Sequence, residues 1–287
     1  MNVMKKIAQI LRSSSSHWVG DGFPVRSLFS YQGDTEATSP FLLFDYAGPH
    51  QFEPNIRNPR GVEQHPHRGF ETVTIVYEGE VSHRDSSGGG GTISRGDVQW
   101  MTAGSGIIHE EFHSEKFSKS GGPFQMVQLW INLPAKDKSA PPAYQALSSS
   151  QIPVVDLEQG TARIIAGTFK GTKGPARTFT PINLWDVRLD AQARVTLDLP
   201  QDHNAMIVVL SGDITSDGQN IRTAEIAQLT RTGNSITLTA ESNTTLLVMT
   251  GEPIAEPVVG YGPFVMNSEA EIREAINDFN NGRFGQF

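Results

Sequence analysis

Two short histidine-containing pairs constrain this chain more than any other feature of its sequence. His65-Pro66-His67 and His109-Glu110-Glu111 each place two metal-binding side chains one residue apart. On a β-strand this spacing directs both side chains to the same face. Two such pairs on neighbouring strands would bring three imidazoles and one carboxylate to one point, a set that suits a first-row divalent metal. We therefore predict one metal site with the ligands His65, His67, His109 and Glu111.

The segment between the two pairs is typical of antiparallel sheet. Residues 72–77 are β-branched or aromatic, which favours a strand over a helix. Residues 78–80 form a predicted turn, after which 81–83 begin the return strand. The glycine-rich segment 86–91 is expected to be a hairpin loop, because no Gly-Lys-Ser/Thr follows it as a phosphate-binding loop would require. A small antiparallel barrel with a metal at its mouth accounts for this order.

Three longer motifs resemble the pirin family. They are His65–Val73, Gly96–Gly104 and Gly262–Asn267, and the resemblance extends from about Val25 to Phe279. It implies an all-β fold of two tandem cupin-type jelly-roll β-barrels, with a single metal in the N-terminal one. Matching motifs assign the metal positions to the same four residues, His65, His67, His109 and Glu111. The second motif departs from the general cupin pattern, since Thr102 stands where a proline is common, and pirins share that departure.

Length and a proline-rich segment predict two domains. A chain of 287 residues is long enough for two barrels, and residues 133–142 are proline-rich and polar. We expect an N-terminal metal-binding barrel at 1–134, a linker at 135–160, and a metal-free barrel with a terminal helix at 161–287. A faint repeat aligns Gly212 with Gly79. This alignment puts Asp198 and Pro200 where His65 and His67 stand. Aligning Leu229-Thr230 with Met101-Thr102 puts Thr237 and Thr239 where His109 and Glu111 stand, so the second barrel is expected to lack the metal.

The C-terminal helix is predicted from its cap. Ser268 and Glu271 form a capping box, and the residues that follow place an apolar stripe at helical spacing. That stripe consists of Ile272, Ala275, Ile276 and Phe279. A single stripe is normally buried, so we expect the helix to pack on the outside of a barrel.

Composition excludes several classes of protein. The absence of cysteine rules out disulfides, thiolate metal sites and a cysteine nucleophile. The net charge of −8 argues against direct nucleic-acid binding, which requires a basic surface. No apolar stretch approaches the ~18 residues of a membrane span, and the short apolar run before Arg12 has no cleavage site. We therefore expect a cytoplasmic protein that has no membrane anchor.

Other polar residues near the motifs have alternative interpretations. Glu71 has the parity of the histidine pair if the strand is not interrupted at Gly69, and it is expected to support the ligands or to be structural. His113 could replace His109 or hydrogen-bond a ligand, and is expected near the mouth. His83 lies in a hairpin before charged residues and is expected to be solvated. Trp100 and Met101 are expected in the core.

Family resemblance also implies an activity. It indicates a non-haem dioxygenase of the quercetin 2,3-dioxygenase type, with Fe(II) as the metal and with a small flavonol-like aromatic and O2 as substrates. Mn, Co, Ni, Cu or Zn also suit these ligands. Glu111 is then expected to act both as a ligand and as the catalytic base that removes the substrate's hydroxyl proton. The alternative is a metal-binding transcriptional co-regulator that binds a protein partner without physiological catalysis. A third option is another cupin reaction, such as the isomerisation of a sugar.

Overall fold

The protein is described by a computed structural model that covers residues 3–13 and 15–287. These residues form two compact units, each built from separate parts of the sequence. The N-terminal barrel comprises 15–35, 41–149 and 254–287, and the C-terminal barrel comprises 36–40, 150–253 and the described residues of 1–14. The two ends of the chain therefore lie in different units from those expected at 1–134 and 161–287.

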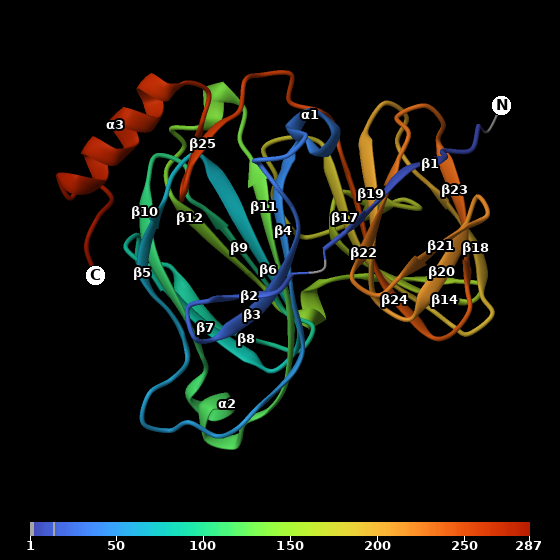
Figure 1. Cartoon of the computed structure of the whole chain (residues 1–287), viewed down its shortest axis with the longest axis horizontal. Helices are drawn as coiled ribbons and strands as arrows, with labels where there is room; N and C mark the ends of the chain where they lie inside the picture. The colour runs from blue at the N-terminus through green and yellow to red at the C-terminus, as the bar shows by residue number, and fades with distance from the viewer. Residues whose placement is uncertain (1–2, 14) are drawn as a thin grey trace. The chain divides into compact units, whose positions relative to one another are not determined.

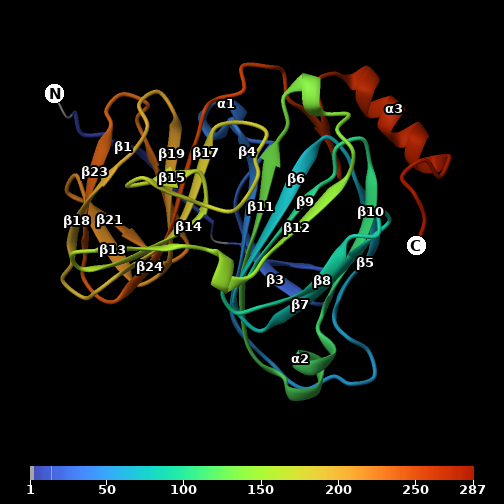
Figure 2. The same cartoon turned by 180° about the vertical axis from the view of Figure 1, so that it is seen from behind.

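The N-terminal barrel consists of two antiparallel sheets, one of seven strands and one of four (Figure 1). The larger sheet contains, in spatial order, β12 (Ala143–Leu147), β9 (Val98–Thr102), β6 (Phe70–Glu78), β11 (Gly122–Asn132), β4 (Phe41–Phe52), β3 (Phe23–Ser30) and β2 (His17–Val19). The smaller contains β5 (Gly61–His67), β10 (Ile107–His113), β7 (Glu80–Asp85) and β8 (Gly90–Ser94). Figure 2 shows β12, β9, β6 and β11 side by side from behind. Short helical segments connect some of the strands, namely α1 (Thr35–Thr38), α2 (Glu115–Ser120), η1 (Ala135–Asp137) and η2 (Ser149–Gln151).

The strands between the two histidine pairs form as predicted, but one of them joins the other sheet. Residues 86–89 connect β7 to β8 as the expected hairpin loop. Strand β7 does not return alongside β6, however, and pairs instead with β10 and β8. The chain changes sheets at Gly79, where φ is +88° and an added Cβ would lie 2.7 Å from the ring of Phe124. Only glycine adopts this turn without strain, so the crossing is fixed locally.

The C-terminal barrel repeats the same arrangement. Its larger sheet contains β1 (Ile7–Arg12), β22 (Glu225–Leu229), β19 (Asn204–Ser211), β24 (Thr244–Gly251), β17 (Ile182–Leu189), β14 (Gly160–Ala166) and β13 (Val154–Leu157). Its smaller sheet contains β18 (Arg194–Asp198), β23 (Ser235–Ala240), β20 (Asp213–Ser216) and β21 (Gln219–Arg222), and β15 (Thr168–Phe169) pairs with β16 (Thr172–Lys173). Gly212 turns the chain between β19 and β20 with φ at +76°, as Gly79 does between β6 and β7. The predicted all-β fold of two cupin-type barrels is confirmed.

Apolar side chains fill the interior of the C-terminal barrel. Val195, Leu197, Ile236 and Leu238 alternate along β18 and β23 and belong to one buried cluster. The alignment had put Thr237 and Thr239 at ligand positions, but both are partly exposed and alternate with the buried residues of β23. Within the described ranges, both clusters of three or more potential metal ligands lie in the N-terminal barrel.

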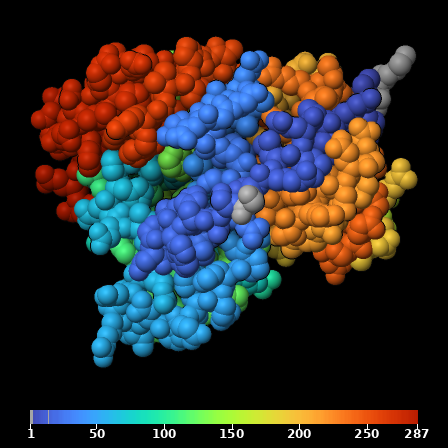
Figure 3. Space-filling model, in the orientation of Figure 1, coloured from blue at the N-terminus to red at the C-terminus, as the bar shows by residue number. Residues whose placement is uncertain are grey.

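The C-terminal segment packs on the N-terminal barrel. Strands β25 (Val259–Tyr261) and β26 (Phe264–Met266) precede helix α3 (Glu269–Asn280), which lies outside the small sheet near β10 (Figures 1 and 2). Ser268 caps the helix as predicted: its Oγ accepts from the Glu271 backbone N–H, and the Glu271 carboxylate accepts from the N–H of Asn267. In the space-filling view this segment forms a continuous part of the barrel's surface (Figure 3). None of the helices in the described ranges combines the length and apolar character needed to cross a membrane.

Candidate metal centre

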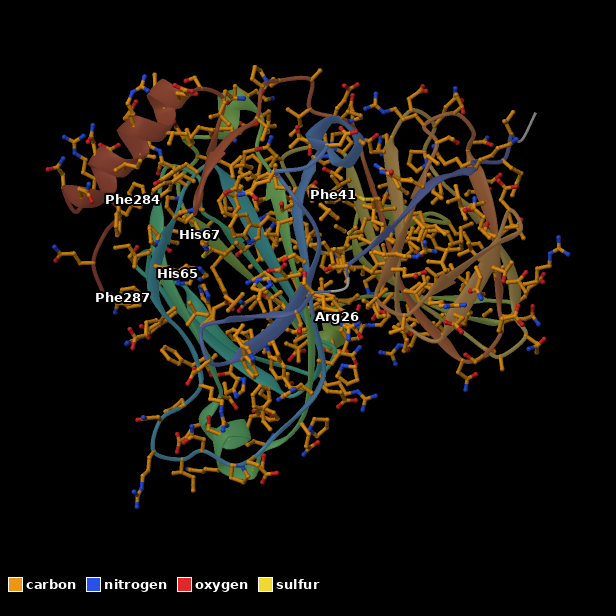
Figure 4. The ribbon with its side chains drawn as sticks, viewed as in Figure 1. Arg26, Phe41, His65, His67, Phe284 and Phe287 are labelled. Carbon is orange, nitrogen blue, oxygen red and sulfur yellow. The ribbon has the colours of Figure 1, made fainter. Side chains whose placement is uncertain are left out.

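Three adjacent strands of the small sheet direct polar side chains into the N-terminal barrel. Strand β10 lies between β5 and β7, so His109 is opposite His65 on one side and Asp85 on the other. Glu111 is opposite His83. Directly opposite residues in an antiparallel pair share a face, which brings these side chains together. Figure 4 shows His65 and His67 on the side of the barrel where Phe284 and Phe287 lie.

Hydrogen bonds orient all three predicted histidine ligands in the same way. The Nδ1 atom of His65 lies 2.8 Å from the carbonyl oxygen of Glu63, and that of His67 lies 3.4 Å from the carbonyl oxygen of Pro263. The Nδ1 atom of His109 lies 3.3 Å from Nδ1 of His83. A carbonyl can only accept, so Nδ1 of His65 and of His67 bears the proton and Nε2 keeps its lone pair.

The Nε2 atom of His109 is buried and has no hydrogen-bond partner. One nitrogen from each of His65, His67 and His109 lies within 4.8 Å of the others. Three converging imidazoles, one of them with an unpaired buried nitrogen, fit a divalent metal, because buried polar atoms are otherwise hydrogen-bonded.

Electrostatics keep the rings of His67 and His109 neutral, which is the form that binds a metal. Burial lowers the pKa of His67 well below its usual value, and the neighbouring His65 lowers it further. Burial likewise lowers the pKa of His109, with further contributions from the surrounding histidines. A buried cation among other imidazoles would be poorly solvated, so both rings are unprotonated at neutral pH.

The carboxylate of Glu111 accepts hydrogen bonds from the opposite sheet. Gln99 Nε2 donates to Oε1, and Thr74 Oγ1 lies 3.4 Å from the same oxygen. Gln128 Nε2 donates to Oε2 at 3.0 Å. These three donors face one another across β9, β6 and β11, and the row continues to Asp45 on β4. Glu111 is therefore held by donors on three strands.

A cavity of about 350 Å³ adjoins the histidines. Trp130 forms part of its wall, stacks on Phe70 with ring centroids 4.3 Å apart, and contacts the His67 ring edge-on at 5.2 Å. Asp45 also lines the cavity; burial raises its pKa, while the hydroxyl of Ser27 donates to it and lowers it. The remaining lining residues are the apolar Val19, Phe23, Val25, Val62 and Met126 and the polar His65, His67, Glu111 and Gln128. This volume lies within the range of small-molecule binding sites.

Two further candidates lie apart from the histidine cluster. Thr74 contacts Glu111, so Thr72 and Thr74 face the interior of the barrel, and Glu71 faces the opposite side of the sheet. The carboxylate of Glu71 accepts a 2.8 Å hydrogen bond from Thr102 instead. The Nε2 atom of His113 lies 2.9 Å from the carbonyl oxygen of Gly22, and its ring packs among phenylalanines. Those rings belong to Phe23, Phe52, Phe117 and Phe124.

The prediction for His83 was wrong. Its side chain is fully buried rather than solvated, because β7 crosses into the small sheet beside β10. His83 shares a second cluster of potential ligands with His109 and Glu111. The sequence did contain a signal, since His83-Arg84-Asp85 has the same one-residue spacing as the two pairs that were recognised. Trp100 and Met101 are fully buried, as predicted.

Comparisons with known proteins agree with the fold. The chain matches the pirin family over residues 22–131 and the pirin C-terminal cupin domain over 184–285. A Pseudomonas aeruginosa protein named as a candidate quercetin 2,3-dioxygenase is 54% identical over 283 residues, covering 98% of this chain and 99% of that protein. Pirin-like protein 2 of Arabidopsis thaliana is 38% identical, covering 99% and 85%.

Solved structures give the same result. The crystal structure of a quercetin 2,3-dioxygenase from Acinetobacter baumannii has a TM-score of 0.96 and 52% identity, covering 99% of each chain. A bacterial pirin from Escherichia coli, solved in complex with nickel(II), has a TM-score of 0.64 over 86% of this chain and 99% of its own. Its sequence identity is 20%, so that likeness concerns the fold alone.

Proposed function

The chain belongs to the pirin family, and we propose that it is a metal-dependent dioxygenase of the quercetin 2,3-dioxygenase type that opens a flavonol ring with O2. The observation that supports this proposal most directly is the cavity itself. Its lining combines His65, His67 and the carboxylate of Glu111 with aromatic and aliphatic side chains. Two relatives at more than half identity bear the name of this activity.

His65, His67, His109 and Glu111 would hold the metal, and we propose Fe(II). Imidazole and carboxylate also accept Mn, Co, Ni, Cu or Zn, so the donor set alone does not select iron. When bound, the metal would polarise the adjacent hydroxyl and ketone oxygens of the flavonol and lower the pKa of that hydroxyl.

Glu111 is the proposed catalytic base. A base must lie within hydrogen-bond reach of the proton that it removes, and Glu111 shares the cavity with His65 and His67. Gln99 and Gln128 donate to different oxygens of this carboxylate, so its plane is set before the substrate binds. Both amides can keep these contacts while the carboxylate accepts the proton.

Other cavity residues would orient the substrate and exclude water. Trp130 presents an aromatic surface next to His67, on which a flat ring can stack. Asp45 can accept a hydrogen bond from a phenolic hydroxyl, one strand beyond Gln128. The apolar side chains between them limit the access of water to the reacting atoms.

Turnover with matched variants tests this proposal. Protein loaded anaerobically with Fe(II) is mixed with quercetin and air, and flavonol loss, O2 uptake and bound iron are measured together. We expect equal consumption of flavonol and O2. Glu111→Gln should lower turnover by about 10²-fold or more while the three histidines retain iron. Glu71→Gln is the control, because it removes a buried carboxylate of the same barrel that faces away from the cavity.

Each contrary result has a definite meaning. Full turnover in Glu111→Gln would remove Glu111 from the role of base. Iron-loaded wild-type protein without turnover would contradict the dioxygenase and favour the metal-binding regulator. Bound iron that survives the loss of His65 and His109 would contradict the ligand assignment.

A further inference from the structure

His83 and Asp85 form a buried pair next to His109, and the proposed reaction does not use this pair. Both side chains are fully buried, and His83 Nε2 lies 3.1 Å from Asp85 Oδ2. The other ring nitrogen of His83, Nδ1, lies 3.3 Å from Nδ1 of His109. Tyr144 stacks on the His83 ring, with centroids 5.0 Å apart and an interplanar angle of 18°. The ring is therefore fixed by a carboxylate, an aromatic face and a second imidazole.

The direction of each hydrogen bond follows from the chemistry of its partners. An ionised carboxylate only accepts, so Nε2 of His83 bears a proton and donates it to Asp85. With its one proton on Nε2, the His83 ring has a lone pair on Nδ1, which can accept only if Nδ1 of His109 bears a proton. That leaves the lone pair of His109 on Nε2, the atom that is buried without a partner. The chain of contacts thus determines which nitrogen of His109 is free.

We propose that Asp85 and His83 are positioning residues that fix His109 in the tautomer whose Nε2 is unprotonated and would be free to bind a metal. This inference rests on the metal site of the proposed function and not on the flavonol chemistry. His65 and His67 obtain the same orientation from backbone carbonyls of Glu63 and Pro263. His109 instead contacts the side chain of His83, which in turn contacts Asp85. Of the three histidines, it is therefore His109 whose orientation depends on which side chains occupy positions 83 and 85.

The two oxygens of Asp85 have separate partners, which makes a sharp test possible. Oδ1 accepts from the backbone N–H of Ser87 at 2.8 Å, from Ser87 Oγ at 2.6 Å and from the N–H of Gly89 at 3.0 Å. Oδ2 contacts His83. Asp85→Asn can keep an oxygen toward the loop while it places an NH2 group toward His83. His83 must then accept at Nε2 and bear its proton on Nδ1, which opposes the proton on Nδ1 of His109.

The experiment measures Co²⁺ affinity of the full-length protein by chelator competition, together with the Co²⁺ absorption spectrum. We expect Asp85→Asn to weaken Co²⁺ binding by about 10- to 100-fold. Ser87→Ala is the matched control; it removes a contact to Oδ1, leaves His83 untouched, and should change the affinity by less than about 3-fold. The His83→Gln variant should retain a higher Co²⁺ affinity than His83→Ala, because the glutamine amide oxygen can accept a hydrogen bond from His109.

A second measurement needs no variant and therefore does not depend on folding. Long-range ¹H–¹⁵N correlation spectra of the metal-free wild-type protein report which nitrogen of each histidine bears the proton. We expect the proton on Nδ1 of His109 and on Nε2 of His83. The opposite tautomer of His109, or wild-type affinity in a folded Asp85→Asn variant, would overturn the proposal. So would a Co²⁺ spectrum that loses a ligand in His83→Ala while Asp85→Asn binds normally, since His83 would then be a ligand. Neither measurement uses turnover, so an absence of dioxygenase activity leaves both results decisive.

Discussion

Replacing Glu71 with glutamine should change how the stability of the N-terminal barrel depends on pH. Glu71 is 1% exposed, and burial raises its pKa from 4.5 to about 7, although the Thr102 hydroxyl that donates to it lowers it. Between these pH values the folded chain keeps a proton that the unfolded chain has released. The contribution of Glu71 to the free energy of unfolding is therefore fully present below pH 4.5 and is lost as the pH rises through 7. At about 1.4 kcal/mol per pH unit, the difference between the two pKa values of Glu71 corresponds to a loss of about 3 kcal/mol in the free energy of unfolding.

Glutamine has the shape of the protonated acid and does not titrate. Relative to the native protein, Glu71→Gln should therefore become more stable by about 3 kcal/mol between about pH 4.5 and pH 8. Any constant difference from packing adds equally at every pH and does not affect this change. Titrations of the buried histidines occur in both proteins and cancel in the comparison.

Chemical denaturation of metal-free protein measures this difference. In a Trp185→Phe background, the remaining tryptophans Trp18, Trp100 and Trp130 all belong to the N-terminal barrel, so their fluorescence reports the unfolding of that unit. A difference in unfolding free energy that is the same at both pH values would refute the reasoning, because Glu71 would then not release its proton within this range. A loss of bound metal in Glu71→Gln would refute its placement away from the cavity.

Two further predictions concern residues that support the site. Lys138→Met should destabilise the N-terminal barrel by about 3 kcal/mol or more, measured by the same fluorescence assay. Its Nζ donates three 2.8 Å hydrogen bonds, to Gly69 O, Asn132 Oδ1 and Val265 O, and all three acceptors would lose this donor. An unchanged denaturation midpoint would contradict this prediction. Gln99→Leu should lower turnover by about tenfold or more at equal iron content, because Oε1 of Glu111 then keeps only the Thr74 hydroxyl at 3.4 Å. Unchanged turnover would show that the Gln99 contact does not orient the base.

Local patterns were sufficient to predict much of the fold and the centre of the site. One-residue spacing on strands identified His65, His67 and His109, which the structure brings together. The capping box of Ser268 located helix α3, because its hydrogen bonds involve neighbours in sequence. The shared turn at Gly79 and Gly212 revealed the internal repeat, because both positions require a positive φ.

Long-range pairing could not be predicted in the same way. Strand β1 pairs with β22, and α3 packs against Phe264 and Met266, so each end of the chain joins a unit that its position in sequence does not indicate. His83 is buried because β7 pairs with β10 after the turn at Gly79. The charged Arg84 that follows His83 in the sequence favoured an exposed hairpin instead, so the sequence led to the wrong prediction. The Pro263 carbonyl that orients His67 comes from 196 residues away.

The two barrels differ in ways that explain why the proposed metal site needs more than its four ligands. In the C-terminal barrel the inward positions of β18 and β23 are aliphatic and need no partners. Burying imidazoles and a carboxylate in the same architecture is costly unless each polar atom is hydrogen-bonded. In the N-terminal barrel Gln99 and Gln128 donate to Glu111, backbone carbonyls accept from His65 and His67, and His83 contacts Nδ1 of His109, which leaves the buried Nε2 of His109 without a hydrogen-bond partner. These supports come from both sheets and from the C-terminal segment. Four ligands transferred alone into the C-terminal barrel would therefore leave unsatisfied polar groups among aliphatic side chains, and would destabilise that barrel rather than create a second site.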